Sequence, residues 1–387
     1  MSRIIKNKKR VFVGMSGGVD SSVAALLLKQ QGYEVTGVFI KCYNIDGCAE
    51  RDAEDARRVA EHIGIPFYVF DFEKEYKKKV VEYMIEGYRA GLTPNPDVMC
   101  NREIKFGLFL KRALSLGANY VATGHYVRIR SSDTSAQGVS GATPKSYPSR
   151  KNRISPSFFL QEAEDKNKDQ SYFLWTLTEN ELKHCLFPIG DYIKPEVRAI
   201  AKKAGLPTAE KKDSQGICFL GMVDVKDFLK KYINAKKGKI LNAEGEVIGT
   251  HEGAVFYTIG QRHGLHIDTK VRGAHDSQAH YVAAKDVKKN ILVVAEGSED
   301  PILFRKEITL VGVNMVMPID IKKKIIVVAR VRYRQPVSEA VLEKINGSKK
   351  TETYKLTFKR PQKFVAEGQS AVFYTKSGGL VGGGIIV

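Results

Sequence analysis

The stretch that decides the fold is Gly14-Met15-Ser16-Gly17-Gly18-Val19-Asp20-Ser21-Ser22. It follows the short apolar run Val11–Met15 and leads into Ser21–Gln31, whose apolar side chains have the spacing of an amphipathic helix. A glycine-rich turn from a buried strand into a helix lets backbone N–H groups approach an anion closely, and the positive helix end adds to the attraction. The stretch therefore predicts a phosphate loop (residues 14–22), to which the serines add hydroxyl donors.

The phosphate loop lacks the Gly-Lys-Ser/Thr sequence of loops that hold a γ-phosphate. Asp20 is an unusual neighbour for a phosphate, and we expect it either to cap the helix or to meet a magnesium ion. A plain glycine turn is the structural alternative, which the full pattern S-G-G-x-D-S disfavours. The pattern resembles the pyrophosphate loop of the N-type ATP pyrophosphatases, which implies cleavage of ATP between its α- and β-phosphates.

Strands and helices alternate downstream of the loop. The expected strands are 34–40, 66–70 and 120–123, and the expected helices are 49–63, 74–90 and 103–116, with a loop over 91–101. Near-continuous apolar strands that alternate with helices predict an α/β fold, a Rossmann-like parallel sheet with helices on both faces. Ile40 and Gly124, which close two of the strands, are expected where adenine and ribose rest, because an open sheet binds ligands at the carboxyl ends of its strands.

The sequence pattern changes after about residue 217, where short expected strands separated by glycines replace the alternation of strands and helices. A chain of 387 residues is long enough for two or three domains. We expect an α/β domain over residues 1–214, a small β-rich connector over 215–281 and a C-terminal β-barrel over 282–387. Residues 131–157 interrupt the first domain and predict a mobile basic loop.

Charge indicates a polyanionic partner. The chain has 62 lysine and arginine residues against 43 acidic ones, a formal net charge of +19. Such an excess favours nucleic acid, because each neutralised phosphate releases counterions, although a merely solubilising surface is the alternative. No apolar run is long enough for a membrane span and no leader peptide is apparent, so a soluble cytoplasmic protein is expected by default.

The five cysteines suggest thiol chemistry rather than a disulfide framework or a metal site. Their number is odd, they are scattered, and neither a C-x-x-C pair nor a paired histidine spacing supports zinc. Cys100 ends the segment Asn95-Pro96-Asp97-Val98-Met99-Cys100 and is expected just before a helix, where a thiolate is favoured. Cys218 follows a polar turn beside Lys211 and Lys212. Each cysteine alone is more often a buried filler, but two thiols together could exchange sulfur.

A series of segments in order resembles the bacterial tRNA-specific 2-thiouridylases. The segments are GMSGGVDSSV, TPNPDVMCNREIKF, ATGHY, KDQSYFL, KKDSQGICF, TIGQR, RYRQ and GQSAVFY, from about residue 10 to the C-terminus. The resemblance implies ATP, with Mg²⁺, tRNA as substrate and a persulfide sulfur donor or carrier protein as partner. The implied ATP-binding residues are Gly14, Met15, Ser16, Gly17, Gly18, Val19, Asp20, Ser21, Ile40 and Gly124.

The same resemblance implies roles for residues of the sulfur chemistry. Cys100 is similar to the family nucleophile, and Cys218 to the cysteine that carries a persulfide, with a transient disulfide between them. Asn95, Pro96 and Asp97 resemble the segment that meets the target base, with Asp97 as the acid or base. Cys42 and Cys48 match no role in the family.

Contacts to tRNA are also implied. The residues are His125, Lys168, Asp169, Gln170, Arg332, Tyr333 and Gln369. Independently of the resemblance, Arg330, Arg332 and Arg334 are expected on one face of a strand over 325–334, since side chains alternate along a strand.

Two other functions stay open. An adenylating ligase with the same loop could use ammonia instead of sulfur, but it would have no need of the two cysteines. A non-catalytic RNA-binding protein could carry a degenerate nucleotide fold, but the intact serines, glycines and Asp20 argue against it.

Overall fold

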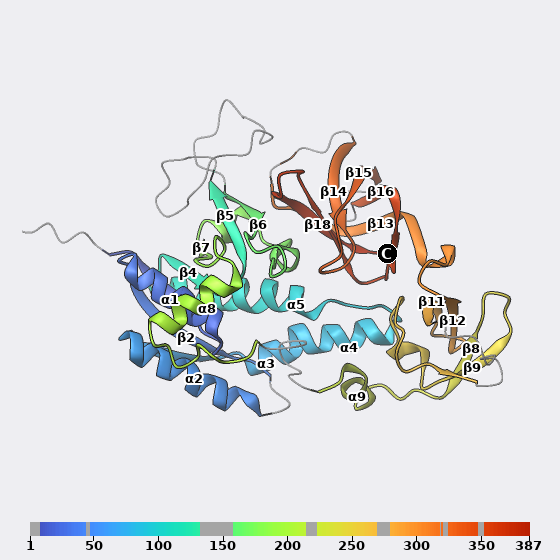
Figure 1. Cartoon of the computed structure of the whole chain (residues 1–387), viewed down its shortest axis with the longest axis horizontal. Coiled ribbons are helices and arrows are strands. Elements are labelled where there is room, and N and C mark those ends of the chain that lie inside the picture. The colour runs from blue at the N-terminus through green and yellow to red at the C-terminus, as the bar shows by residue number, and fades with distance from the viewer. Residues whose placement is uncertain are drawn as a thin grey trace, which may run out of the picture.

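A five-stranded parallel sheet organises the first part of the chain (Figure 1). The computed structural model describes residues 8–43, 47–131, 158–213, 223–268, 279–317, 319, 324–346 and 352–387. The sheet has the strand order β3-β2-β1-β4-β7, and all of its pairings are parallel. Its strands are β1 (Arg10–Gly14), β2 (Glu34–Lys41), β3 (Phe67–Asp71), β4 (Tyr120–Thr123) and β7 (Cys185–Leu186).

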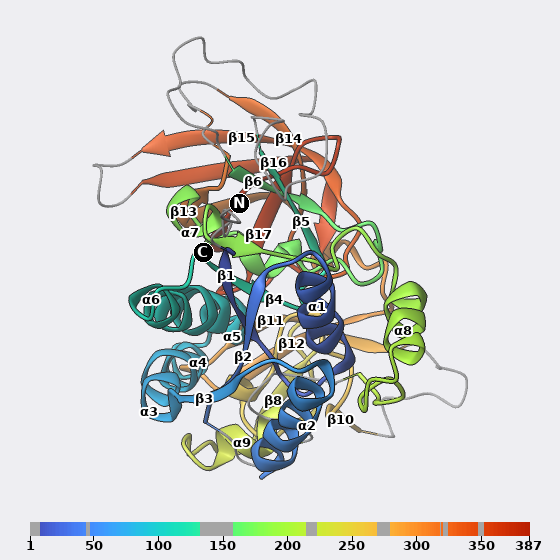
Figure 2. The same ribbon diagram turned by 90° about the vertical axis from the view of Figure 1, so that its left-hand side faces the viewer.

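Helices cover both faces of this sheet, because side chains alternate along each strand. Val11 and Val13 pack in one core against α1 (Val19–Gln30), α2 (Cys48–Ile63) and α8 (Lys194–Lys203). Phe12 points into a second core on the opposite face, with Phe109 and Leu110. Figure 2 shows the two helical layers on either side of the strands. The predicted fold class is confirmed.

Two long helical segments form the second layer. One joins α3 (Glu73–Tyr76), a π-helical stretch at Lys77–Val81 and α4 (Glu82–Arg89). The other joins α5 (Pro96–Met99), a π-helical stretch at Cys100–Phe109 and α6 (Leu110–Ser115). Its start at Pro96 shows that the loop predicted over 91–101 is too long.

The hairpin of β5 (Val127–Ser131) and β6 (Phe158–Glu162) follows the sheet. Most of the basic loop predicted at 131–157 lies outside the described residues. The chain continues through a 3₁₀-helix at Ser171–Leu174 and α7 (Glu179–Leu182).

A mixed sheet forms the middle of the molecule, in the order β10-β9-β8-β12-β11. Its strands are β8 (Gly238–Leu241), β9 (Val247–His251), β10 (His266–Ile267), β11 (His280–Asp286) and β12 (Ile291–Glu296), with α9 (Val225–Lys230) before them and a 3₁₀-helix at Ala254–Phe256. Ile240, Val282 and Leu292 share a core with Val80 and Met84 of the helical layer. Since Tyr281 is the second residue of β11, this sheet continues past residue 281.

The C-terminal part is a closed barrel of six strands, as predicted. After a 3₁₀-helix at Pro301–Leu303, the strands are β13 (Phe304–Met315), β14 (Ile325–Arg330), β15 (Ser338–Asn346), β16 (Thr353–Lys363), β17 (Ser370–Tyr374) and β18 (Leu380–Ile386). Closure leaves no unpaired strand edge. In the part of the chain that the structure describes, no helix is long and apolar enough to cross a membrane.

The barrel is fastened to the α/β part by Trp175, which is 3% exposed. Its indole N–H donates to Oγ of Ser370 at 3.0 Å, and the ring covers Gly383 of β18. A Cβ atom at Gly383 would lie 2.6 Å from Cγ of Trp175. Only glycine therefore allows this packing.

Gly383→Ala is accordingly expected to lower the free energy of unfolding by about 1–3 kcal/mol, the usual effect of overpacking a core. Urea unfolding measures the change. Ile326→Ala, at a side chain that is 76% exposed on β14, is the control and should shift stability by less than about 0.5 kcal/mol. Equal effects of the two substitutions would contradict the proposed fit of the barrel against Trp175.

Candidate functional site

Close backbone contacts shape the phosphate loop at the carboxyl end of β1. Gly17 has φ +73°, and a Cβ atom there would lie 2.3 Å from the carbonyl oxygen of Asp52 in α2. A Cβ atom at Gly124, which follows β4, would lie 2.6 Å from the backbone nitrogen of Ser21. These glycines let α2 and the end of β4 press against the loop, so the loop is held from both sides.

The serines of the loop have different roles. The backbone N–H of Ser16 donates to Oγ of Ser21 at 3.1 Å, and the Ser21 hydroxyl donates to the carbonyl of Gly18 at 3.2 Å. Ser22 is fully buried, donates to the same carbonyl at 2.8 Å and accepts from Thr208 at 3.0 Å. Only Ser16 is exposed. Ser21 and Ser22 therefore hold the turn closed, while Ser16 can reach a ligand directly.

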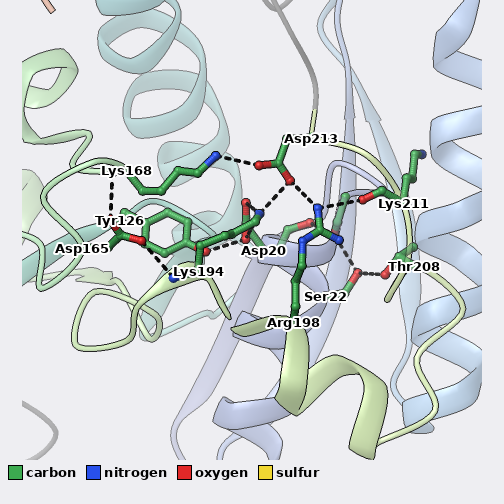
Figure 3. A network of polar contacts seen from close by, with 12 residues as sticks. Asp20, Ser22, Tyr126, Asp165, Lys168, Lys194, Arg198, Thr208, Lys211 and Asp213 are labelled. Atoms are coloured by element: carbon green, nitrogen blue, oxygen red, sulfur yellow. Dashed lines mark hydrogen bonds and ion pairs between the residues drawn. The ribbon is translucent and has the colours of Figure 1, made fainter. Parts of the chain in front are cut away.

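Asp20 does not cap α1, so the first of its two expected roles is wrong, while a contact with magnesium stays a prediction. The N-cap residue is Gly18, and no side chain caps the helix. The Asp20 carboxylate instead accepts hydrogen bonds from the Tyr126 hydroxyl at 2.8 Å and from the Lys194 ammonium at 2.8 and 2.9 Å (Figure 3). The start of α1 thus keeps its backbone donors for an anion, as the binding of phosphate at a helix N-terminus requires.

Lys194 links the phosphate loop to a second carboxylate, Asp213. Its ammonium lies 2.8 Å from Oδ1 of Asp213 and is largely buried. Asp213 also accepts from Lys168 at 2.7 Å and from Arg198 at 2.8 Å (Figure 3). We call Asp20, Lys168, Lys194, Arg198 and Asp213 the charge network. Burial raises the pKa of the Asp213 carboxyl, but the hydrogen bonds from Lys168 and Lys194 outweigh it and lower the pKa to about 2.

A further ion-paired lysine lies on the other side of the loop. Lys211 contacts Asp52 at 2.8 Å and Asp55 at 2.5 Å, both in α2. Asp52 is also the residue whose carbonyl touches Gly17. Both flanks of the loop are therefore fixed by lysine–carboxylate pairs.

Sequence reasoning assigned no role in this site to Tyr126, Lys194, Arg198 or Asp213. Tyr126 lies in the segment ATGHY and Asp213 in the segment KKDSQGICF, which both carry the resemblance, whereas no such signal marks Lys194 or Arg198. Burial raises the pKa of the Tyr126 phenol, and the nearby Asp20 carboxylate raises it further. Tyr126 therefore acts as a hydrogen-bond donor to Asp20.

Ile40 and Gly124 flank the loop as expected. Ile40 is the penultimate residue of β2, and its Cδ1 atom lies 3.6 Å from the position of a Cβ atom on Gly14. Gly124 follows β4 directly. Both residues thus lie at the carboxyl ends of strands beside the end of β1, while their contact with adenine and ribose stays a prediction.

Cys100 lies within a helix rather than before one, so the predicted position is wrong. Asn95 is the N-cap, and its side chain accepts from the backbone N–H of Val98 at 3.2 Å, with Pro96 at the first helical position. Cys100 is therefore in the second turn and is 2% exposed. The helix end acts mainly on its first turn, so the helix dipole favours a carboxylate at Asp97 more than a thiolate at Cys100.

Cys218 lies outside the described residues, which resume at Val223 after Asp213. Its persulfide role and its disulfide with Cys100 stay predictions. Within the described part of the chain, no group of three or more histidine, cysteine or acidic side chains is arranged to hold a metal ion.

Comparison with known proteins places this site in a family. The model of the tRNA methyl transferase HUP domain matches residues 9–222, that of the tRNA methyl transferase PRC-barrel domain residues 226–296, and that of the aminomethyltransferase β-barrel domain residues 305–386. The tRNA-specific 2-thiouridylase MnmA of Pseudomonas entomophila is 46% identical over 384 residues, 98% of this chain and 95% of the relative. The tRNA-specific 2-thiouridylase MnmA of Bacillus licheniformis is 45% identical over 384 residues, 97% of this chain and 94% of the relative.

The chain belongs to the tRNA-specific 2-thiouridylase family. Similarity to solved structures of other proteins is weaker. The solved structure of a 4-thiouridine synthetase–RNA complex with bound ATP has a TM-score of 0.33, with 16% identity over 58% of this chain and 50% of that chain. This likeness carries no weight beside the relatives of the same length.

Several of the residues that family resemblance assigns to tRNA contacts form hydrogen bonds or pack inside the protein. His125 is buried between Phe106 and Phe187, and its Nδ1 atom lies 2.7 Å from Oγ1 of Thr123. Burial lowers the pKa of its imidazole well below the usual range, and Lys105 lowers it further. A neutral, buried imidazole can meet RNA only if this pocket opens, so the contact stays a prediction.

The segment Lys168–Gln170 also has internal partners. Asp169 is 3% exposed and accepts from the backbone N–H of Ala163 at 3.0 Å and from the Ser171 hydroxyl at 2.8 Å. Gln170 accepts from the backbone N–H of Tyr126 at 2.9 Å. This segment therefore holds Tyr126 and Lys168 near the charge network, and its RNA contacts stay predictions.

The three arginines predicted on one strand face are not on one strand. β14 ends at Arg330, and Arg334 has φ +63° in the turn that follows. At this turn Arg330 pairs with Glu162, and Arg332 donates to the carbonyl of Ile259. Of the three, only Arg334 is exposed.

A basic groove of about 580 Å³ lies beside this turn on the barrel. It is lined by residues 332–338 and 360–364, which include Arg332, Tyr333, Arg334, Arg360 and Lys363. Cationic and aromatic side chains together suit phosphates and unstacked bases. Arg332 and Tyr333 line this groove, and their contacts with RNA stay predictions.

Alanine substitutions at two adjacent glycines of the phosphate loop are expected to differ in their effect on stability. Gly17→Ala is expected to lower the free energy of unfolding by roughly 1–3 kcal/mol, because the new Cβ atom would collide with the Asp52 carbonyl at a positive φ. At Gly18, φ is −93° and the nearest atom is Oγ of Ser16 at 3.5 Å. Gly18→Ala should therefore change stability by less than about 1 kcal/mol. Urea unfolding of both variants tests this, and equal losses would contradict the described loop.

Titration of Asp213 is expected to make the stability of the fold depend on pH. Its pKa in the folded state is about 2, below the value of about 3.9 expected in the unfolded chain. It therefore stabilises the fold above pH 4 or so, and this contribution is lost as the pH falls from about 4 towards 2. Asp213→Asn should be less stable at neutral pH and lose less stability across that window. Urea midpoints at neutral and acidic pH measure both, with the exposed Asp227→Asn as the control that keeps the wild-type profile.

Proposed function

We propose that this chain is an ATP-dependent tRNA 2-thiouridylase. It adenylates the C2 carbonyl oxygen of the wobble uridine, expected in the tRNAs for lysine, glutamate and glutamine, and replaces that oxygen with sulfur. The observation that carries the proposal is the phosphate loop, built as an anion site with an uncapped helix start, in a chain that matches 2-thiouridylases over 98% of its length. The products are 2-thiouridine, AMP and pyrophosphate.

The residues around the loop have distinct tasks in this proposal. Residues 14–21 surround the phosphates of ATP, with the backbone N–H groups at the start of α1 and the Ser16 hydroxyl as donors, and Ile40 and Gly124 lie beside the nucleoside. Mg²⁺ prefers oxygen ligands and commonly takes one carboxylate together with substrate phosphates. Asp20 would supply such a carboxylate if the ion is bound, and the Lys194 ammonium would help to neutralise phosphate charge.

The sulfur step is proposed to use both cysteines. Sulfur arrives on Cys218 as a persulfide from an external donor or carrier protein. In one route the terminal persulfide sulfur attacks C2 and AMP leaves, after which Cys100 attacks the Cys218 sulfur and frees the thiocarbonyl. In the other, Cys100 attacks first, releases hydrosulfide, and the hydrosulfide displaces AMP. Either route ends in a Cys100–Cys218 disulfide, which an external thiol reductant must reduce.

Asn95, Pro96 and Asp97 are proposed to meet the target base, with Asp97 moving the proton. The wobble base lies in a single-stranded loop, so its exposure costs little. The basic groove on the barrel is proposed to hold RNA farther from the base. We propose that this enzyme acts in the cytoplasm, where tRNA and ATP are both present.

Methyl transfer is the second candidate, because two of the matching family models are described as tRNA methyl transferase domains. The full-length relatives named 2-thiouridylase and the phosphate loop favour thiolation. Mass spectrometry of anticodon nucleosides, after reaction with ATP and a sulfide source, separates the two. Formation of 2-thiouridine with ATP consumption supports the proposal; a methylated nucleoside, or none, would overturn it.

Mutation of the cysteines separates the two half-reactions. Cys218→Ser should still release tRNA-dependent pyrophosphate, because adenylation needs no thiol, but should lose thiouridine formation by at least about a hundredfold. Thiouridine is quantified with a persulfide donor as the only sulfur source. Cys42→Ser is the control and should keep turnover within about twofold, since Cys42 packs against an apolar core. Undiminished thiolation by Cys218→Ser would refute the assigned role.

A further inference from the structure

The base loop (residues 93–97) has few backbone hydrogen-bond donors of its own. Pro94 and Pro96 lack an N–H group, so the loop cannot form a regular ladder with a neighbouring strand. Thr93 is nevertheless 7% exposed, and buried backbone groups require partners inside the protein. Those partners come from another part of the chain.

The barrel supplies them. The N–H of Thr93 donates to the carbonyl of Glu367 at 2.7 Å, and the side-chain amide of Gln369 donates to the Thr93 carbonyl at 2.9 Å. The same amide nitrogen lies 3.4 Å from the carbonyl of Pro94. The turn between Glu367 and Gln369 thus satisfies the backbone of Thr93 on both sides.

This turn is itself fixed to the last barrel strand. Gly368 has φ +87°, and its N–H donates to the carbonyl of Ile386 at 2.9 Å. The N–H of Ile386 donates in return to the carbonyl of Gln369 at 2.9 Å. A Cβ atom at Gly368 would lie 2.9 Å from the nitrogen of Thr93, so the turn and the base loop are in direct contact. The turn is therefore a rigid part of the barrel.

Two further elements hold the base loop in place. The Thr93 hydroxyl lies 3.3 Å from the hydroxyl of Thr258 in the middle part of the chain. Gly87 of α4 packs against the Pro94 ring, since a Cβ atom at Gly87 would lie 2.7 Å from it. All three parts of the molecule thus meet at the base loop.

We infer that Gln369 is a positioning residue that fixes the base loop. Its amide N–H groups point at protein carbonyls. Beyond Pro94, Asn95 caps the helix that carries Asp97 and Cys100, so the position of Thr93 sets the position of both groups. The barrel is in this way part of the catalytic site without touching the reacting atoms. The effect of Gln369 on turnover rests on the proposed function. The hydrogen bonds that hold Thr93 against Glu367 and Gln369, which we call the clamp, do not.

The clamp can be tested through the accessibility of Cys100, which is buried by the helix that the base loop starts. Gln369→Ala should raise the rate of Cys100 alkylation by iodoacetamide about fivefold, the effect of one neutral hydrogen bond on local opening. Mass spectrometry of the Cys100 peptide from the full-length protein gives the rate. The equally buried Cys185, on β7, is the internal reference and should not change.

Gln161→Ala is the matched control. Its side-chain amide also donates to a barrel carbonyl, that of Ser377 at 3.1 Å, but the contact is made by β6 and not by the base loop. This variant should leave Cys100 alkylation within about twofold of wild type. A specific increase in Gln369→Ala supports the clamp. No increase, or an equal increase at Cys185, would overturn it.

Turnover gives a second readout. Gln369→Ala should lower kcat for thiouridine formation about tenfold at saturating tRNA, because the variant misplaces reacting groups. A weaker Kd for tRNA with unchanged kcat and unchanged Cys100 alkylation would overturn the positioning role. If the wild type makes no thiouridine, the proposed function fails while the alkylation result still decides the clamp.

Discussion

One buried ammonium group connects the parts of the phosphate site. Lys194 contacts both Asp20, at the start of α1, and Asp213, which precedes the segment that bears Cys218. An isolated buried charge would be costly, so each member depends on the others for compensation. The result is a phosphate loop whose acidic residue is turned towards α8 and away from the helix start. The anion site stays open because the Asp20 carboxylate is already paired with Lys194.

A second constraint operates at the opposite end of the site. The base loop is rich in proline and cannot satisfy its own backbone, so the barrel turn at Glu367–Gln369 does so. Catalytic geometry on such a loop would be imprecise without outside support, since loops are less well determined than helices and strands. The three parts of the chain therefore form one working unit, and the barrel has a role at the site besides its basic groove.

Several polar residues that family resemblance associates with RNA are engaged inside the protein. Asp169, Gln170 and Gln369 hold backbone groups, and His125 is packed among aromatic rings. The groove that includes Arg334, Arg360 and Lys363 has cationic side chains that suit RNA, and the RNA contacts of all these residues stay predictions. Residues that hold a site together and residues that touch its substrate can occupy the same short motifs, and sequence alone does not separate them.

The local pattern of the sequence was sufficient to predict the phosphate loop, the parallel α/β sheet and the barrel. Glycine and serine spacing, apolar strands and turn residues act over a few neighbouring positions, so their consequences can be predicted without tertiary contacts. Only the tertiary structure decided the partner of Asp20, because Lys194 is 174 positions away in the chain. It also decided that Cys100 lies inside a helix, since the Asn95 cap and Pro96 start that helix early. The clamp at Thr93 joins residues 276 positions apart, and contacts of that length depend on how whole layers pack.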